Sequence, residues 1–260
     1  MQATRTTVPA TYRSIAHRFA TVATAPAPRR TVEIDIHHPD AFALAADRIR
    51  TEAILVQFPA VVVLLAAPTA EGAARLDAAK VRLPGKTYGT LVGNLDRFVA
   101  QADTERLPEG FRTAADFAKM TGTFARIPVR DVRFESPVIR SGTHQGVLVD
   151  GIHRKLVILL ETQFIGEAPD PIWDGDNYTG LLCTSANLSG HPDGSIVTVE
   201  LARLFARERG IGLLLTCSER SSELGSYPIF GYERDAVRIH REGPFLETFK
   251  QRIPEALRTW

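Results

Sequence analysis

Net charge, cysteine and long hydrophobic runs are all scarce in this sequence. The 31 Lys and Arg residues are balanced by 30 Asp and Glu, which leaves a formal charge of +1 and excludes a chain-wide basic field for nucleic acid. The two cysteines, Cys183 and Cys217, exclude a disulfide framework and a Cys-x-x-Cys motif, and they favour a reducing cytoplasm. The longest apolar run, 61–67, has the length of a buried strand and is much shorter than the roughly 20 residues of a membrane-spanning helix. The sequence therefore predicts a soluble protein that does not enter a membrane.

What the chain does contain is material for one large core. It has 260 residues, of which 44% are hydrophobic, enough to bury a sizeable interior. Residues 1–30 differ from the rest, because Asp and Glu are absent before Glu33 while five arginines lie among Ala, Thr and Ser. This composition predicts a basic, loosely ordered extension, and it also suits an organelle transit peptide. Residues 31–260 contain no Pro-, Gly- or Ser-rich linker and are predicted to form a single domain.

Hydrophobic periodicity predicts alternating strands and helices in the first half of the chain. Strands are expected at 31–36, 53–58 and 89–92, and helices from Asp40, at 73–80 and at 95–99. From Phe134 onward strand signals dominate, and strands are expected at 146–149, 155–160, 180–183, 213–216 and 236–240. One late helix is expected to begin at the N-cap Thr198 and to end before Gly210. This order predicts an α/β (α+β) fold built on a mixed sheet.

Two glycine-containing stretches fail the requirements of nucleotide-binding motifs. Gly85-Lys86-Thr87 has the tail of a phosphate-binding P-loop, but Lys80 stands where that loop needs its first glycine. Gly210-x-Gly212 fails as a dinucleotide fingerprint, because Leu215 stands where the third glycine is needed. The sequence therefore predicts neither a P-loop enzyme nor a dinucleotide-binding unit.

Three cations lie within seven residues at the end of the second expected helix: Lys80, Arg82 and Lys86. Ammonium groups combined with a planar guanidinium suit a polyphosphate. The alternative is a solvated basic turn, since basic residues are also favoured at helix C-termini by the helix dipole.

The stretch 184–190, Thr-Ser-Ala-Asn-Leu-Ser-Gly, follows an expected buried strand. The end of a sheet strand is the usual place for a ligand crevice in α/β proteins. Small hydroxyl and amide side chains leave backbone N–H groups accessible to an anion and add donors of their own. The alternative is an ordinary Ser/Asn/Gly turn, although a turn does not require this order of residues.

With these motifs in place, the sequence resembles the YrdC family of threonylcarbamoyl-AMP synthases. The stretch 184–190 reproduces the family's Ser-Ala-Asn-x-Ser-Gly signature, and Lys80-x-Arg82 with Lys86 matches its Lys-x-Arg-Pro-x-x-Lys segment, with Leu83 in place of the proline. Three weaker matches follow the family's order along the chain: Arg140 to His144, Ser226, and Arg241-Glu-Gly. The resemblance covers roughly residues 40–244.

The resemblance implies a strongly twisted mixed sheet with flanking helices and a concave basic cleft. It also implies a reaction in which ATP, bicarbonate and L-threonine yield threonylcarbamoyl-AMP and pyrophosphate for tRNA modification, with Mg²⁺ accompanying ATP. Three residues are implied as catalytic, namely Lys80, Arg82 and Ser185. The implied binding residues for nucleotide and carbamoyl group are Lys86, Thr184, Asn187, Ser189, Arg140, Ser226 and Arg241. tRNA or tRNA-modifying proteins are the implied partners.

One departure from the family bears on the substrate. The family's Pro-Thr-x-Thr-x-Tyr-Gly loop, which grips threonine, aligns with 59–65, Pro-Ala-Val-Val-Val-Leu-Leu, so its hydroxyls are replaced by apolar residues. Two alternatives to threonylcarbamoyl-AMP synthesis therefore stay open. One is a related adenylate-forming enzyme acting on a different amine or carbamoyl donor. The other is a non-catalytic RNA- or nucleotide-binding protein with the same fold.

The sequence indicates no metal cage of its own. Asp170, Asp174 and Asp176 fall in an insertion, but Tyr178 and Thr179 occupy positions where a calcium loop needs Asp or Asn and then Gly. A solvated loop is the simpler interpretation, and a role in holding Mg²⁺ with ATP is the alternative. His144 is interpreted either as part of the matched motif or as a structural histidine.

Overall fold

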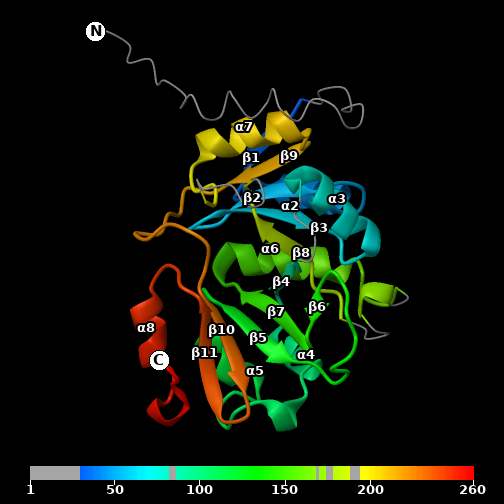
Figure 1. Cartoon of the computed structure of the whole chain (residues 1–260). Helices are drawn as coiled ribbons and strands as arrows, with labels where there is room; N and C mark the ends of the chain where they lie inside the picture. The colour runs from blue at the N-terminus through cyan, green and yellow to red at the C-terminus, as the bar shows by residue number, and fades with distance from the viewer. Residues whose placement is uncertain (1–29, 82–85, 168–169, 174–177, 188–193) are drawn as a thin grey trace.

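A single mixed sheet runs through the computed structural model, which describes residues 30–81, 86–167, 170–173, 178–187 and 194–260. In this part of the chain eleven strands pair in the order β1-β9-β2-β3-β8-β4-β7-β5-β10-β11, with β6 added beside β7 (Figure 1). The strand bounds are β1 Val32–Asp35, β2 Ile54–Gln57, β3 Val62–Ala66, β4 Gly89–Val92, β5 Phe124–Pro128, β6 Ile139–Arg140, β7 Thr143–Leu148, β8 Leu182–Ser185, β9 Leu213–Thr216, β10 Ile229–Glu233 and β11 Ala236–Arg241. Parallel and antiparallel pairs are both present, so the predicted fold class is confirmed.

Helices cover both faces of this sheet. Their bounds are α2 Ala41–Ile49, α3 Ala70–Lys80, α4 Leu95–Ala100, α5 Ala114–Ala118, α6 Gly151–Thr162, α7 Val199–Arg209 and α8 Leu246–Gln251. Three short 3₁₀ turns lie at Thr104–Arg106, Pro171–Trp173 and Glu255–Leu257. Within the described residues, none of these helices combines the length and apolar character needed to cross a membrane.

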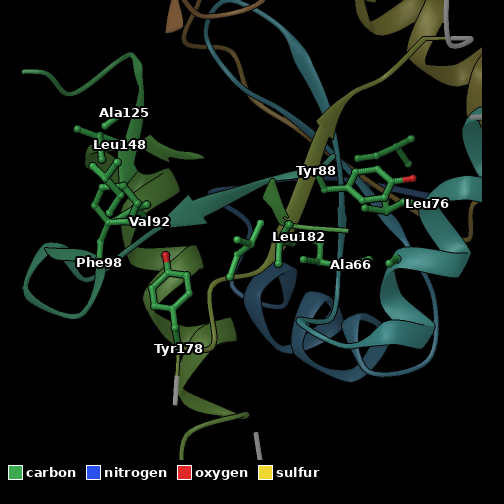
Figure 2. Close-up of a cluster of buried hydrophobic side chains, with 14 of the residues drawn as sticks. Ala66, Leu76, Tyr88, Val92, Phe98, Ala125, Leu148, Tyr178 and Leu182 are labelled. Carbon is green, nitrogen blue, oxygen red and sulfur yellow. The ribbon is translucent and has the colours of Figure 1, made fainter. Parts of the chain in front are cut away.

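Strand β3 shows how one apolar run divides the core in two. Successive side chains of a strand point to opposite faces, so Val62 and Leu64 pack in one cluster while Val63 and Leu65 pack in the other. The first cluster contains side chains of α3, α4, α5 and α7 and is drawn in part in Figure 2. The second contains side chains of α2 and α6. Because β3 is buried on both sides, its sequence lacks the alternation of a half-exposed strand.

Local signals placed several helices correctly. The late helix is confirmed as α7, with the Thr198 hydroxyl accepting a hydrogen bond from the N–H of Leu201 and Gly210 in the left-handed conformation at φ 65°. The helix expected at 73–80 is α3, which begins three residues earlier because Thr69 caps it through the N–H of Gly72. Both starts follow from hydroxyl caps.

The strand predicted at 155–160 is wrong, because these residues lie inside helix α6. Leu156, Val157 and Leu160 are buried, whereas Ile158 and Leu159 are each 40% exposed, which is the spacing of a one-sided helix. The continuous apolar run concealed that spacing. The prediction also missed β5, β6, β10, α5 and α8, which the structure adds.

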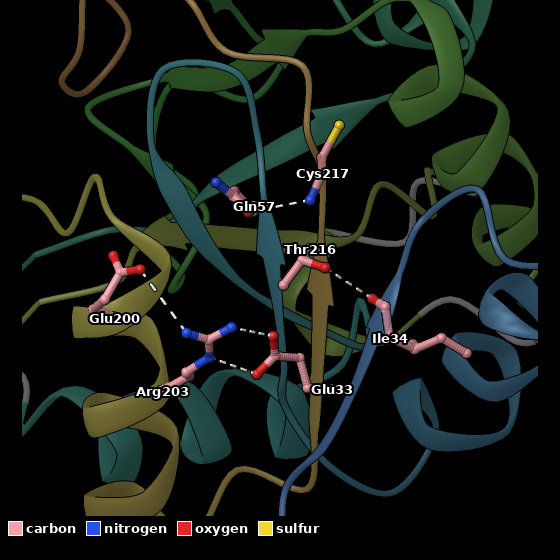
Figure 3. A network of polar contacts seen from close by, with 7 residues as sticks. All are labelled: Glu33, Ile34, Gln57, Glu200, Arg203, Thr216 and Cys217. Atoms are coloured by element: carbon pink, nitrogen blue, oxygen red, sulfur yellow. Dashed lines mark hydrogen bonds and ion pairs between the residues drawn. The ribbon is translucent and has the colours of Figure 1, made fainter. Parts of the chain in front are cut away.

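The outer edge of the sheet is held by a polar network (Figure 3). Strand β1 pairs in parallel with β9, and Arg203 of α7 donates from Nε and Nη2 to the Glu33 carboxylate at 2.7 Å each. Glu200 lies 3.9 Å from the same guanidinium. The basic extension expected at 1–30 falls outside the described residues except for Arg30.

Candidate functional site

A cavity of about 800 Å³ opens on the face of the sheet that carries α2 and α6. Strands β3, β8, β4, β7, β5, β10 and β11 each contribute lining residues, as do the end of α3 and the segments beside it. Its volume lies within the range of roughly 300–1,000 Å³ that small-molecule sites occupy.

Eight of the ten residues that the sequence singles out line this one cavity. They are Lys80, Lys86, Arg140, Thr184, Ser185, Asn187, Ser226 and Arg241. The other two, Arg82 and Ser189, lie outside the described residues. The basic stretch after α3 and the hydroxyl-bearing stretch after β8 therefore share one hollow, although about a hundred residues separate them in sequence. The individual roles of these residues stay predictions.

Lys80 is the most tightly held of these side chains. It is the last residue of α3, is 4% exposed, and its Nζ donates to Thr184 Oγ1 at 2.9 Å, to the Ser185 carbonyl at 2.8 Å and to Asn187 Oδ1 at 2.8 Å. An ammonium has three donors and no acceptor. The lysine thus links the C-terminal end of α3 to the C-terminal end of β8. It holds the side chains of Thr184 and Asn187 and the carbonyl of Ser185 in place.

The segment that follows β8 is anchored on its other side by β3. The N–H of Ala186 donates to the Val62 carbonyl at 2.8 Å, and the N–H of Ile196 donates to the Ala186 carbonyl at 2.8 Å. Ser185 Oγ donates to Asn187 Oδ1 at 3.2 Å. These bonds preorganise small polar groups beside the lysine, as binding of an anionic ligand requires.

Two further basic side chains, Arg241 and Arg126, line the cavity. The sequence motifs indicated only Arg241. Arg241 donates to the Tyr227 carbonyl from Nε at 3.1 Å and from Nη2 at 2.6 Å, and its guanidinium lies 5.4 Å from the centre of the Phe124 ring. Arg126 of β5 donates to Gln145 Oε1 at 2.8 Å. Because β5 was not predicted, no signal indicated which face of a strand Arg126 would occupy.

A register shift aims Arg241 at the cavity. Ile229 of β10 pairs with Arg241, whereas the next residue, Phe230, pairs with Ile239, so His240 is an extra residue in β11. In a regular strand, residues 239 and 241 would face the same side. Ile239 packs against the first core cluster, while Arg241 lines the cavity on the opposite face. Such bulges commonly redirect a side chain at a binding site.

The cavity is strongly biased toward anions. Its lining contains five cationic side chains, and among the described lining residues there is no Asp or Glu: Lys80, Lys86, Arg126, Arg140 and Arg241. Burial lowers the pKa of both Arg126 and Arg241, and the charge of Arg126 adds to the lowering at Arg241. Arginine nevertheless stays protonated in proteins. A cationic hollow of this kind attracts phosphate and carboxylate groups.

One section of the cavity wall is apolar. Val61 and Val63 line the cavity together with Phe58, Leu91 and Val147. The first two belong to the 59–65 stretch in which the sequence lacks the threonine-gripping hydroxyls. This part of the wall has no side-chain donor or acceptor to offer a ligand.

The sequence motifs also indicated Ser226 and His144, which the structure places in different surroundings. Ser226 lines the cavity, and its Oγ lies 2.5 Å from Ser195 Oγ. His144 belongs to the opposite face of β7, where it is fully buried with Nε2 3.1 Å from Thr90 Oγ1 and rings of Trp173 and Tyr178 around it. Burial lowers the pKa of His144 to about 3. The interpretation of His144 as a structural histidine is the one that fits.

The described residues contain no group of three or more His, Cys, Asp or Glu that could hold a metal ion. Asp170 accepts hydrogen bonds from the N–H groups of Ala70 and Ile172 and is not among the described lining residues. Asp174 and Asp176 lie outside the described residues. The described lining therefore offers no carboxylate ligand for Mg²⁺.

Comparison with known proteins identifies the fold. No family model matches the sequence, and no curated protein does. Among solved structures, P. abyssi Sua5 complexed with L-threonine matches with a TM-score of 0.64 and 18% identity over 88% of this chain and 62% of that chain. E. coli YciO matches with a TM-score of 0.58 and 13% identity over 83% of this chain and 96% of that chain.

A third solved structure, full-length HypF in its phosphate- and nucleotide-bound form, matches with a TM-score of 0.54 and 14% identity over 77% of this chain and 28% of that chain. This chain spans less than two thirds of the two Sua5 chains it matches, 65% and 62%. At such identities the likeness establishes the fold. The YrdC-like fold expected from the sequence motifs is confirmed.

Proposed function

We propose that this chain is a nucleotidyl-transferring enzyme that binds ATP in the cavity and forms a carbamoyl-type adenylate. The observation that carries the proposal is the pairing of Lys80 with the Thr184–Asn187 segment beside an anion-attracting hollow. The likeness in fold to Sua5 and to the nucleotide-bound HypF supports it.

The proposed reaction balances in two steps. The amino nitrogen of an acceptor attacks the carbon of bicarbonate, a C–N bond forms, and a C–O bond of bicarbonate breaks, which releases water and leaves a carbamate. A carbamate oxygen then attacks the α-phosphorus of ATP, and the bond to the β-phosphate oxygen breaks to release pyrophosphate. No protein nucleophile takes part, so the protein contributes placement and neutralisation of charge.

The residues divide this work by position. Lys80 and, from the sequence, Arg82 stabilise negative charge on the phosphorus and on the leaving pyrophosphate, with Lys86 nearby. Ser185 holds the carbamate in line, with Thr184, Asn187 and Ser189 beside it. Arg140, Ser226 and Arg241 enclose the bound molecules, as their places on the cavity wall allow. The described lining supplies no carboxylate for Mg²⁺, so the ATP phosphates themselves would hold it, and it would neutralise part of their charge.

L-threonine is the acceptor with which other amines are compared, because the sequence resembles threonylcarbamoyl-AMP synthases and Sua5 has been solved with L-threonine. The corresponding cellular role is tRNA modification in the cytoplasm. The second candidate is the same adenylate chemistry with another amine or carbamoyl donor. The specific observation in its favour is the apolar wall at Phe58, Val61 and Val63.

The test measures pyrophosphate release by the full-length protein from ATP and bicarbonate, with each of the common amino acids in turn. We expect release that depends on both bicarbonate and an amino acid, and a product with the mass of a carbamoyl adenylate. ATP binding without pyrophosphate release from any amine would overturn the enzymatic proposal in favour of a non-catalytic nucleotide-binding protein. RNA binding without ATP binding would overturn the nucleotide site as well.

A further inference from the structure

We infer that the acceptor is an α-amino acid with an apolar side chain, whose carboxylate binds between Arg126 and Arg241. The inference rests on the proposed function and names the class of amine that the cavity accepts. Two independent features of the cavity carry it: the arginine pair, and the apolar row that separates this pair from Lys80.

The two arginines converge although their strands are not adjacent. Strand β10 lies between β5 and β11, but the Arg241 guanidinium extends back over the Phe124 ring of β5, two residues from Arg126. The hydrogen-bond partners that the structure gives them, Gln145 and the Tyr227 carbonyl, are neutral. Two half-buried guanidinium groups with neutral partners repel each other, and each has donors left over. A carboxylate between them relieves the repulsion and accepts charge-assisted hydrogen bonds.

The arginine pair lies on other elements than Lys80 and Ser185, beside which the ATP phosphates are proposed to bind (the phosphate end). Ser185 lies on β8 and Arg126 on β5, which are three strand intervals apart in the order β8-β4-β7-β5. At a spacing of roughly 4.8 Å per interval, the two strand backbones are about 14 Å apart, and the long side chains shorten this gap, because the charges of Arg241 and Lys80 both act on the Cys183 thiol of β8. A substrate that joins the two ends needs a second anionic group beyond the one activated by ATP. The α-carboxylate of an amino acid is such a group.

Part of the floor between the two ends is apolar, beside the polar side chain of Gln145. Leu91, Val147 and Phe124 pair in register across β4, β7 and β5, and all three line the cavity. Gly89 allows the Phe124 ring to extend across β7, since a Cβ at position 89 would lie 2.6 Å from a Phe124 ring carbon. Cys183 of β8, which pairs with Gly89, lies beside this row, and burial raises the pKa of its thiol, so the thiol is neutral. A side chain attached next to the carboxylate rests on this floor and is selected for apolar character.

The experiment titrates full-length protein by calorimetry in the presence and absence of the non-reacting nucleotide α,β-methylene-ATP. The ligands are L-leucine, L-threonine and 3-methylbutylamine, which is leucine without its carboxylate. We expect L-leucine to bind about tenfold or more tightly than either of the other two. Arg126→Gln is expected to weaken L-leucine about tenfold while changing the affinity for the nucleotide less than about twofold.

Two further variants accompany this experiment: the first is a control for Arg126→Gln, and the second tests the apolar wall. Arg133→Gln makes the same substitution on an exposed residue outside the cavity lining and should leave both affinities unchanged. Val63→Thr adds a hydroxyl to the apolar wall without changing its volume greatly, and should shift preference toward L-threonine. Thermal melting of each variant verifies that it is folded.

Each contrary result has a distinct meaning. Preference of the native protein for L-threonine, equal binding of 3-methylbutylamine and L-leucine, or no binding of any of the three overturns the inference. So does an Arg126→Gln variant that loses nucleotide affinity as much as L-leucine affinity, because the arginines would then bind phosphate. Loss of the proposed function is seen separately, as failure of the native protein to bind α,β-methylene-ATP or to release pyrophosphate from ATP.

Discussion

On the central strands of the sheet, neighbouring residues point to opposite faces, so that one is buried in the core and the next lines the cavity. On β7, His144 is fully buried on the face packed against α3, α4, α5 and α7, here called the helix-covered face, whereas Gln145 lines the cavity on the face that α2 and α6 cover only in part, the open face. On β5, Ile127 is buried in the first core cluster and Arg126 lines the cavity. The difference shows that one uncovered section of a sheet is sufficient to make a site. On β5, the charged side chain faces the section of the sheet that α2 and α6 leave uncovered.

The largest effect is expected on the helix-covered face. Phe98 is fully buried in the first core cluster, with its ring 6.0 Å from that of Phe117. Phe98→Ala should lower the free energy of unfolding by about 3–5 kcal/mol, because it leaves a cavity in a close-packed core. Urea denaturation measures the loss, and Leu159→Ala, at an exposed position on α6, is the control. A loss below about 1 kcal/mol would mean that this face is not close-packed.

On the open face the expected loss is in turnover. Lys80→Ala removes the donor that joins Thr184, Ser185 and Asn187, and should reduce ATP affinity or pyrophosphate release by about tenfold to a hundredfold. Arg82→Ala should act in the same direction. Lys155→Ala, at an exposed position on α6, provides the matched control. Unchanged affinity and turnover in both cavity variants would remove the phosphates from this end of the cavity.

A pH dependence sharpens the contrast between His144 and the cavity. Because burial lowers the pKa of His144 to about 3, its neutral form stabilises the fold above the unfolded pKa of about 6.5, and this stability is lost as pH falls toward 3. Between about pH 6.5 and 5.5 the expected loss is about 1 kcal/mol, because the unfolded histidine goes from half to almost fully protonated. Denaturation at both pH values should show a smaller loss for His144→Gln. His153, also buried with a lowered pKa, is present in both proteins and cancels. Equal pH slopes would contradict a neutral, buried His144.

The smallest effect is expected at the exposed edge of the sheet. The Arg203 side chain is 51% exposed and that of Glu33 34% exposed, so solvent and salt screen their ion pair. Glu33→Gln should cost less than about 1 kcal/mol in the free energy of unfolding. The difference from the native protein should shrink further as salt is raised. A larger cost would show that β1 depends on this pair for its place in the sheet.

The sequence was most informative where one local interaction decides the structure. Thr198 and Gly210 marked both ends of α7, and the uninterrupted apolar run at 61–67 marked the buried strand β3. It was least informative where burial and period are ambiguous. The 155–160 run was mistaken for a strand because its exposed members, Ile158 and Leu159, are themselves apolar.

The same distinction applies to the residues of the candidate site: some were indicated by local sequence and others were not. Lys80 and the 184–187 segment could be singled out because each combines several polar groups within a few residues. Arg126 could not, since a lone arginine in an unrecognised strand has no pattern, and its proximity to Arg241 arises only from strand order and from the extra residue His240 in β11.

The sequence by itself determined the mixed α/β class, the buried strand β3 and the polar segments at two strand and helix ends, because caps, apolar runs and clustered hydroxyls act over a few residues. Only the tertiary structure decided that these ends meet in one cavity, that five cations line it without a described carboxylate, and that Val61 and Val63 form part of its wall. The physical reason is that strand order and register set which side chains face one another, and both are fixed by packing between segments that are distant in the chain.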